Sequence, residues 1–517
     1  MVFNSLTFLY FIAAFLPLYF LTGESVLRSA LYGVADRWRL HDRMSGSALL
    51  TLHRVFKYVS QYARYVVCLV FSYIFYGWWD WRFVFLLMTT TVMDYTLGRL
   101  MERNEDDGYR KRMIVVSVIM NLGFLGFFKY FNFFTDSIVR GMSQFGMQPS
   151  WTMLHIILPV GISFYTFQSM SYTIDIYRRE IKAERDFIKF AAFVAFFPQL
   201  VAGPIVRASD FLPQFREEKT WDWNRVISGF TRILWGLFKK IAIADTIAPF
   251  VDLCFGSPGS FTSMHLAIGV FFYSFQIYCD FSGYSDIAIG LARILGFDFL
   301  ENFKTPYFSK NFSEFWGRWH ISLSSWLRDY LYIPLGGNRN GKWGTYRNNM
   351  LTMLIGGLWH GASWAFVFWG FLHGLYLIVQ RLIGRPFGAL MRALYFPKPL
   401  QTGINVTIVY LLTCFAWIYF RCGSFGNRSF AVANQVILGI ADLKTFTWEG
   451  VIDKFLVMKG VLLIGILISV ELSNFRFAYS SWALRSPIFR VASFVCLMLL
   501  LARFGTFGSK TFIYFQF

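Results

Sequence analysis

Residues 348–380 read NNMLTMLIGGLWHGASWAFVFWGFLHGLYLIVQ, an apolar stretch with a histidine near its middle. A membrane-spanning helix needs about 20 such residues, so this stretch is too long for one span. Five glycines interrupt it, at Gly356, Gly357, Gly361, Gly370 and Gly374. We therefore predict a tight hairpin or a re-entrant pair of helices, buried in protein. The spacings Gly357/Gly361 and Gly370/Gly374 would let neighbouring helices approach closely.

The whole chain shares this apolar character. It has 517 residues, of which 56% are hydrophobic and only 15% charged. A soluble domain of that length would carry more charge, so most of the surface must meet lipid. The formal net charge of +19 does not indicate nucleic-acid binding, because the basic residues stand in short clusters between apolar runs. The six cysteines are scattered without a CxxC pair, which indicates buried hydrophobic residues rather than disulfides or a metal site.

The length criterion divides the chain into membrane segments. Clear candidates are 5–22, 58–78, 82–98, 113–134, 152–174, 226–245, 264–279, 403–420, 455–472 and 488–505, and less regular ones are 187–206, 281–300 and 348–380. The first run lacks a basic flank and a cleavage site, so we expect a retained helix. We find no internal repeat and no long linker. The sequence therefore predicts about ten to thirteen segments in a single domain, 1–517.

The placement of lysine and arginine predicts the orientation of these segments. Basic loops follow the first, third, fifth and later segments, at 23–57, 99–112, 178–189 and 381–392. Such loops are typical of the cytoplasmic side. The stretch 133–151 is poor in charge and is expected outside. The alternation places both the N-terminus and the C-terminus on the extracytoplasmic side.

Residues 301–347 read ENFKTPYFSKNFSEFWGRWHISLSSWLRDYLYIPLGGNRNGKWGTYR. Apolar residues recur at helical spacing from Asn311 to Ile333, with Ser313 as the expected N-cap and Pro334 in the stop. The segment is too charged to span and predicts an amphipathic helix in the cytoplasmic interface. Its cations include Lys304, Arg318, Arg328 and Arg339. Two interpretations stay open for them: attraction to anionic lipid head groups, or a dock for a polyanionic donor such as coenzyme A.

His360 is the sharpest candidate for catalysis. It lies in the apolar run GGLWHGASW, where an ionisable residue is costly and usually functional. Imidazole suits general-base work because its pKa lies near operating pH. The alternative is a structural histidine bonded to the carbonyl of a neighbouring helix. For His373 that structural interpretation is the leading one.

Motifs of other enzyme classes are not found. The sequence has no GxSxG elbow, no P-loop, no HExxH and no ligand set at metal spacing, so no metal is predicted. Carboxylates within apolar segments are few, namely Asp175, Asp280, Asp286 and Glu471. They give little support to a proton-coupled transporter.

Several long strings together resemble one family. They are FWGRWHISLSSWLRDYLYIPLGGNR (315–339), MLIGGLWHGASW (353–364), LPVGISFYTFQSMSYTIDIYR (158–178), FFPQLVAGPIVR (196–207) and YCDFSGYSDIAIGL (278–291). The chain is similar to the membrane-bound O-acyltransferases (MBOAT), most closely to their alginate-type bacterial branch. The resemblance implies an all-α fold of about eleven transmembrane helices with re-entrant segments around a central tunnel.

The resemblance also implies a chemistry. His360 in the LWHGA string would be catalytic, and His320 in the RWHISLS string would be the second active-site residue. An acyl group would come from a cytosolic thioester such as acetyl-CoA, with no bound cofactor. It would pass to an extracytoplasmic, esterase-like partner protein that modifies an exported polysaccharide.

The segment 511–517 reads TFIYFQF and matches the pattern FxYxxF through Phe512, Tyr514 and Phe517. A similar motif occurs on a small partner peptide within the family, whose tyrosine is thought to carry the acyl group. The resemblance therefore implies that Tyr514 is an acyl carrier. The alternative is an aromatic anchor in the membrane interface.

These points predict an inner-membrane O-acyltransferase, with acetyl as the expected acyl group. His360 would take the proton from the attacking hydroxyl, and His320 would orient the thioester or stabilise the oxyanion. One rival is the same fold acting on peptidoglycan, teichoic acid or lipid. The other is a transporter or flippase, which would move substrate without acyl transfer.

Overall fold

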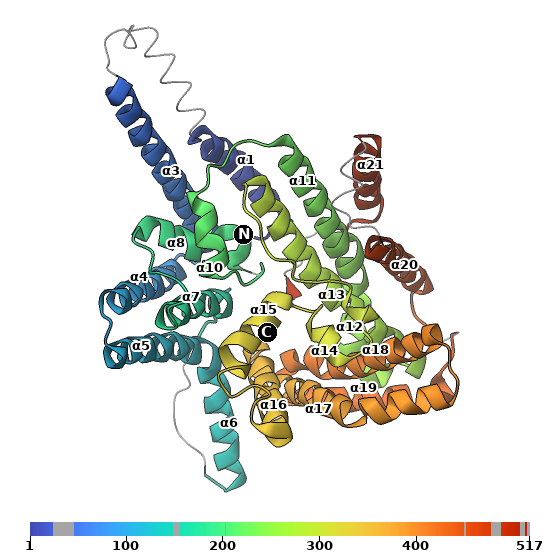
Figure 1. The fold of residues 1–517 in the computed structure, drawn as a ribbon. Helices are drawn as coiled ribbons and strands as arrows, with labels where there is room; N and C mark the ends of the chain where they lie inside the picture. The colour runs from blue at the N-terminus through green and yellow to red at the C-terminus, as the bar shows by residue number, and fades with distance from the viewer. Residues whose placement is uncertain are drawn as a thin grey trace. The chain divides into compact units, whose positions relative to one another are not determined.

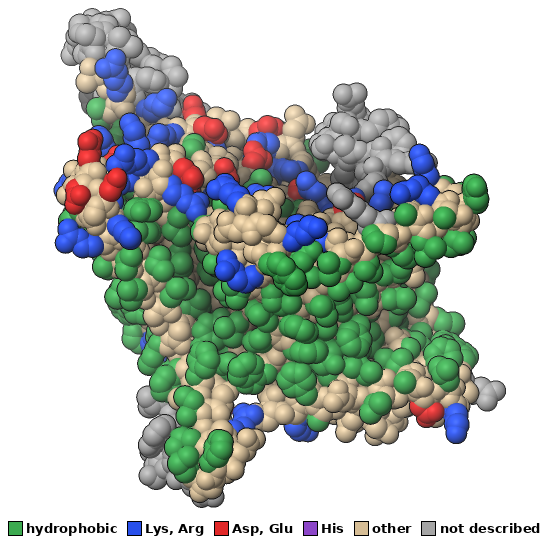
Figure 2. All heavy atoms as spheres, turned by 60° about the horizontal axis from the view of Figure 1, so that its bottom comes forward, with side chains coloured by type: hydrophobic (Ala, Val, Ile, Leu, Met, Phe, Trp, Pro, Cys, Tyr) green, Lys and Arg blue, Asp and Glu red, His purple; other side chains and the backbone are tan. Residues whose placement is uncertain are grey.

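In the computed structural model the described residues are 1–23, 46–147, 156–201, 203–448, 451–476, 487–506 and 512–513. Within these ranges every regular element is a helix (Figure 1). Four helical stretches are long and apolar enough to cross a membrane: Asp107–Gln144, Trp364–Gly384, Lys398–Ala441 and Lys454–Ser473. Large areas of the face drawn in Figure 2 carry hydrophobic side chains. The expected all-α, multi-pass membrane protein is confirmed, whereas the helix count and the tunnel stay predictions.

The chain groups into two compact units. Unit 1 contains 1–132, 152–233 and 288–299, and unit 2 contains 133–151, 234–287 and 300–517. Both units draw on distant parts of the sequence. The single domain expected over 1–517 stays a prediction, and each unit is described by itself.

Unit 1 is built on helices that bury aromatic, polar and charged side chains. Its main elements are α1 (Leu6–Leu21), α3 (Gly46–Gly77), α4 (Arg82–Arg103), α5 (Asp107–Leu125), α7 (Ile162–Tyr177) and α8 (Phe187–Ala195). The ring of Phe15 in α1 packs edge-on against that of Phe197, with centroids 5.2 Å apart. Asp94 of α4 accepts hydrogen bonds from Ser117 and Asn121 of α5, at 2.7 and 3.0 Å. These buried bonds hold α4 against α5.

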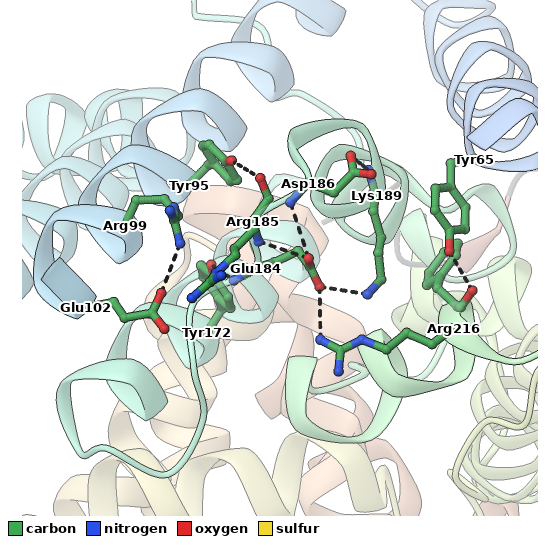
Figure 3. A network of polar contacts seen from close by, with 11 residues as sticks. Tyr65, Tyr95, Arg99, Glu102, Tyr172, Glu184, Arg185, Asp186, Lys189 and Arg216 are labelled. Atoms are coloured by element: carbon green, nitrogen blue, oxygen red, sulfur yellow. Dashed lines mark hydrogen bonds and ion pairs between the residues drawn. The ribbon is translucent and has the colours of Figure 1, made fainter. Parts of the chain in front are cut away.

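A polar network fastens the loop between α7 and α8 (Figure 3). The carboxylate of Glu184 accepts hydrogen bonds from the backbone N–H groups of Arg185 and Asp186. It also pairs with the ammonium of Lys189 at 2.7 Å. The hydroxyl of Tyr172 accepts from the backbone N–H of Glu184. This basic loop is therefore fixed from both of the helices that flank it.

Unit 2 holds the segments singled out by the sequence. Its elements are the π-helical η4 (Phe238–Ala244), α12 (Asp245–Gly256), most of α13 (Ser263–Ile294), α14 (Phe312–Trp316), α15 (Ile321–Leu327), η7 (Arg328–Tyr332), α16 (Gly341–His360), α17 (Trp364–Ala393), α18 (Lys398–Cys422), α19 (Ser429–Ala441), α20 (Lys454–Arg476) and α21 (Pro487–Phe504). The expected separation of 264–279 from 281–300 is wrong, because α13 runs through both. Asp280 does not break it, since Lys240 pairs with this carboxylate at 2.7 Å.

The expected hairpin is confirmed in α16 and α17, which pack along each other (Figure 1). A Cβ atom on Gly357 would collide with the carbonyl of Phe366, and one on Gly370 with the carbonyl of Met353. Glycine at these two positions therefore allows the backbones to touch. The turn ends at Ser363, whose hydroxyl caps α17 by accepting from a backbone N–H.

The single amphipathic helix expected from Asn311 to Ile333 is wrong. The chain forms α14, α15 and η7, with a break at 317–320. Asn311, not Ser313, caps α14, since its side-chain oxygen accepts from the backbone N–H of Glu314 at 2.9 Å. The break arises because 318–321 bonds instead with 302–304, through backbone hydrogen bonds of 2.9 Å. Many of the apolar side chains of this segment are buried in the protein rather than laid on its surface.

Candidate active site

His320 stands at the break before α15, in an unusual backbone conformation. Its φ of 44° and ψ of 54° lie in the left-handed region, which is uncommon for a residue other than glycine. The following N–H, from Ile321, donates to the carbonyl of Asn302 at 2.9 Å. Strained positions of this kind persist only where the surroundings hold them, and they cluster at functional sites.

The side chain of Asn302 fixes the state of the His320 ring. Its amide oxygen accepts from the backbone N–H of Ser322 at 3.1 Å and from the Ser322 hydroxyl at 2.9 Å. The same oxygen lies 3.3 Å from Nδ1 of His320, and the amide nitrogen donates to Ser285. Because an amide oxygen only accepts, the ring proton belongs on Nδ1. The lone pair of His320 is then on Nε2.

Burial keeps this ring neutral. His320 has no solvent-exposed surface, and desolvation lowers its pKa to about 3. The ring of Phe281 packs edge-on against it, with centroids 4.6 Å apart. At physiological pH the imidazole is therefore uncharged.

The structure brings His360 beside His320. The two ring centroids are 6.4 Å apart. His360 is the last residue of α16 and is 3% exposed. The rings of Trp369 and Phe420 lie 5.0 and 5.3 Å from it.

His373 lies on α17 and differs from the other two. It is fully buried, with the rings of Trp369 and Trp316 at 4.7 and 5.1 Å. Neither ring nitrogen has a hydrogen-bond partner among the described residues. Its surroundings favour packing over chemistry.

The predicted donor-binding cations do not share one environment. Lys304 and Arg339 are exposed. Arg318 pairs with Glu314 at 2.6 Å, and Arg328 pairs with its neighbour Asp329 at 2.7 Å. Lipid attraction and donor docking both stay predictions for this set.

The segment near Tyr514 reaches the neighbourhood of His320. Phe512 and Ile513 are buried, at 1% and 4% exposure, whereas Tyr514 itself lies outside the described residues. The ring of Phe512 lies 5.8 Å from that of Phe281, which in turn packs on His320.

The sequence did not reveal Asn302, Ser322 or Phe281 as parts of the site. Each is a common residue type without a local pattern. Their contacts with His320 come from chain segments that meet only in three dimensions. By contrast, the carboxylates Asp280 and Asp286 were noticed, and each pairs with a lysine of η4.

The fold and site define a class of protein: a helical membrane enzyme with a buried histidine pair. No group of three or more His, Cys, Asp or Glu side chains that could hold a metal ion is found in the part of the chain that is described.

Comparison with known proteins gives the family. Residues 74–425 match the model of the membrane-bound O-acyltransferase family, and this range includes both histidines. The chain belongs to that family. It is 42% identical to a probable alginate O-acetylase, AlgI, of Pseudomonas aeruginosa, over 81% of this chain and 72% of that protein. It is 35% identical to a peptidoglycan O-acetyltransferase of Helicobacter pylori, over 72% of each. It is 28% identical to a teichoic acid D-alanyltransferase of Bacillus subtilis, over 44% of this chain and 60% of that one.

Proposed function

We propose that this chain takes an acetyl group from a cytosolic thioester such as acetyl-CoA and passes it across the inner membrane for O-acetylation of an exported polysaccharide. An extracytoplasmic, esterase-like partner would complete the transfer. The observation that carries the proposal is the buried pair of His320 and His360, 6.4 Å apart between ring centroids. The similarity to probable alginate O-acetylases supports the choice of acetyl and polysaccharide.

The chemistry follows from the states of the two rings. An acceptor hydroxyl attacks the thioester carbonyl, and its proton must pass to a base and then to the departing thiolate. The sequence favoured His360 as this base and His320 as a donor to the oxyanion. The contact between Nδ1 of His320 and the amide oxygen of Asn302, 3.3 Å apart, supports the reverse division. We propose that Nε2 of His320 accepts the proton of the attacking hydroxyl. His360 would then face the negative charge that develops on the carbonyl oxygen of the thioester.

Tyr514 is proposed as the first acceptor of the acyl group. A phenol with a pKa near 10 is a poor nucleophile until a base takes its proton, and its ester is a reactive donor for the next hydroxyl. A tethered phenol also has an effective concentration of about millimolar near the base. Support comes from Phe512 and Ile513, which are buried; Phe512 lies beside Phe281, the ring that packs on His320.

The direct test supplies radiolabelled acetyl-CoA to the purified protein. Label should enter the protein and then, with the partner and polymer present, the polymer. Label in peptidoglycan instead would favour the rival acceptor, for which the Helicobacter pylori relative is the supporting similarity. Movement of substrate with no acyl transfer, and with no loss in a His360→Ala protein, would favour a transporter.

The Tyr514→Phe variant tests the carrier. It keeps the ring and removes only the oxygen, so an aromatic anchor would survive the change. We expect protein labelling and polymer acylation to be lost. Tyr395→Phe is the matched control, because Tyr395 is 93% exposed on another part of the chain. Normal polymer acylation by the Tyr514→Phe protein would leave the segment as an anchor.

Orientation is tested separately. Cysteines placed at Arg339 and at Lys304, both exposed, should react with an impermeant reagent only from the cytoplasmic side. Reaction from outside would exclude a donor dock at this segment.

A further inference from the structure

A cluster of buried charges lies beside the candidate active site and takes no part in the proposed chemistry. It is centred on Lys240 of η4. Its ammonium nitrogen is 2.7 Å from the carboxylate of Asp280 and 2.9 Å from that of Asp245. All three side chains are at most 5% exposed. Buried charges are costly unless paired, so this arrangement calls for an explanation beyond the packing of helices.

Asp280 differs from Asp245 in one respect. Its second carboxylate oxygen accepts a hydrogen bond of 2.7 Å from the backbone N–H of Ile513. This bond joins α13 to a segment more than 230 positions away in the sequence. A backbone N–H bonded to a carboxylate is a strong, charge-assisted contact. The ammonium of Lys240, beside the other oxygen, favours the ionised form of this carboxylate.

The adjacent residue, Phe512, is held by aromatic contacts on the same helix. Its ring lies 4.6 Å from that of Tyr284 and 5.8 Å from that of Phe281. Phe281 follows Asp280 directly and also packs on His320 at 4.6 Å. Two consecutive residues of α13 therefore have different partners: Asp280 binds Ile513, and Phe281 contacts His320.

We propose that Asp280, held by Lys240, is the anchor of a peptide-binding site that holds the segment 512–513 beside His320. The ligand is a short peptide with an aromatic residue, supplied by the chain itself. Since consecutive Cα atoms are about 3.8 Å apart, an anchor at Ile513 fixes the point from which residue 514 begins. The anchor thus sets the reach of the segment toward the histidine pair. The functional part of this proposal rests on Tyr514 as the acyl acceptor.

Two pairs of variants separate the anchor from general effects. Ile513→Pro removes the N–H that donates a hydrogen bond to Asp280, whereas Ile513→Ala removes the side chain and keeps this N–H. Asp280→Ala removes the anchor, whereas Asp245→Ala removes the other partner of Lys240. Both Ile513 variants keep the two carboxylates of Lys240, and each aspartate variant keeps one, so the comparisons isolate the bond to Ile513.

Docking is measured by fluorine NMR on the full-length protein in detergent, with 4-fluorophenylalanine at position 512. A docked ring near Phe281 and Tyr284 should have a shifted resonance that a soluble paramagnetic reagent does not broaden. We expect the docked-to-free ratio to fall roughly tenfold or more in Ile513→Pro and Asp280→Ala, because a charge-assisted bond is lost. It should fall less in Ile513→Ala, which loses the buried side chain but keeps the N–H, and it should stay near the parent value in Asp245→Ala.

A second readout is the radiolabel that Tyr514 takes from acetyl-CoA in the same proteins. An unchanged docked resonance in both Ile513→Pro and Asp280→Ala would overturn the anchor. An equal loss in Asp245→Ala would also overturn it, since the cluster as a whole would then be responsible. If docking depends on Asp280 but no label reaches Tyr514 in the parent, the carrier role fails and the anchor stands.

Discussion

Two buried regions of unit 2 hold ionisable side chains in opposite ways. Around Lys240 the charges are paired, with the carboxylates of Asp280 and Asp245 within 3 Å of the ammonium. Around His320 the ring contacts neutral groups, the amide of Asn302 and the hydroxyl of Ser322, and burial keeps the imidazole uncharged. Both regions are almost closed to solvent.

The difference lies in what each region leaves available for reaction. A charged side chain that is paired with an opposite charge is held in place by that partner, so it stabilises the fold. A neutral imidazole held at Nδ1 keeps a lone pair on Nε2, so it can accept a proton. Burial alone therefore does not distinguish a reactive site from a structural one. The chemical nature of the partner does.

The largest expected effect tests the reactive region. His320→Ala and His360→Ala should each reduce acyl transfer about 10²–10⁴-fold, because each removes a group that handles the proton or the developing charge. Initial rates with labelled acetyl-CoA, normalised to monodisperse protein, measure the effect. Near-normal rates in either well-folded variant would remove that histidine from the mechanism.

The paired region should respond with a loss of stability. Lys240→Met leaves two buried carboxylates without their cation and should lower the free energy of unfolding by about 3–5 kcal/mol. Thermal denaturation in detergent checks this, with Lys444→Met as the control because Lys444 is exposed. A Lys240→Met protein as stable as the parent would mean that the carboxylates are already protonated, and the contrast between the regions would disappear.

Asn302→Asp replaces the neutral amide beside His320 with a carboxylate, so that the ring gains a charged partner like that of Lys240. A carboxylate beside Nδ1 favours the imidazolium and should raise the pKa of His320 from its depressed value of about 3. Because the base acts only when deprotonated, the acid limb of the kcat/KM profile should move to higher pH.

Asn338→Asp is the control for that change, since Asn338 is exposed. The profiles must extend from about pH 2 to pH 8, because the acid limb of the parent is expected near the His320 pKa of about 3. If the acid limb of Asn302→Asp coincides with that of the parent, His320 is not the proton acceptor.

The smallest effect is expected at His373. Its ring nitrogens have no hydrogen-bond partner among the described residues, and aromatic rings surround it. His373→Phe keeps a buried ring of similar size, so stability should change by less than about 1.5 kcal/mol and transfer rates only slightly. A loss comparable to that of His360→Ala would place His373 in the reactive region.

Predictions from the sequence succeeded where one local pattern carried the information. The glycines at 357 and 370 indicated a hairpin, and α16 and α17 form it. His360 stood out because an ionisable residue is rare in an apolar run. The prediction of one helix over 311–333 failed, because helical spacing of apolar residues cannot report the backbone bonds that 318–321 makes with 302–304.

By itself the sequence determined that this protein is helical, lies in a membrane and belongs with O-acyltransferases, because apolar length and family strings are local properties of the chain. Only the tertiary structure decided that Asn302 faces Nδ1 of His320, that His360 lies beside it, and that Asp280 holds Ile513. Each of these contacts joins segments distant in sequence. Their geometry depends on how the helices pack, and no local pattern of residue types encodes it.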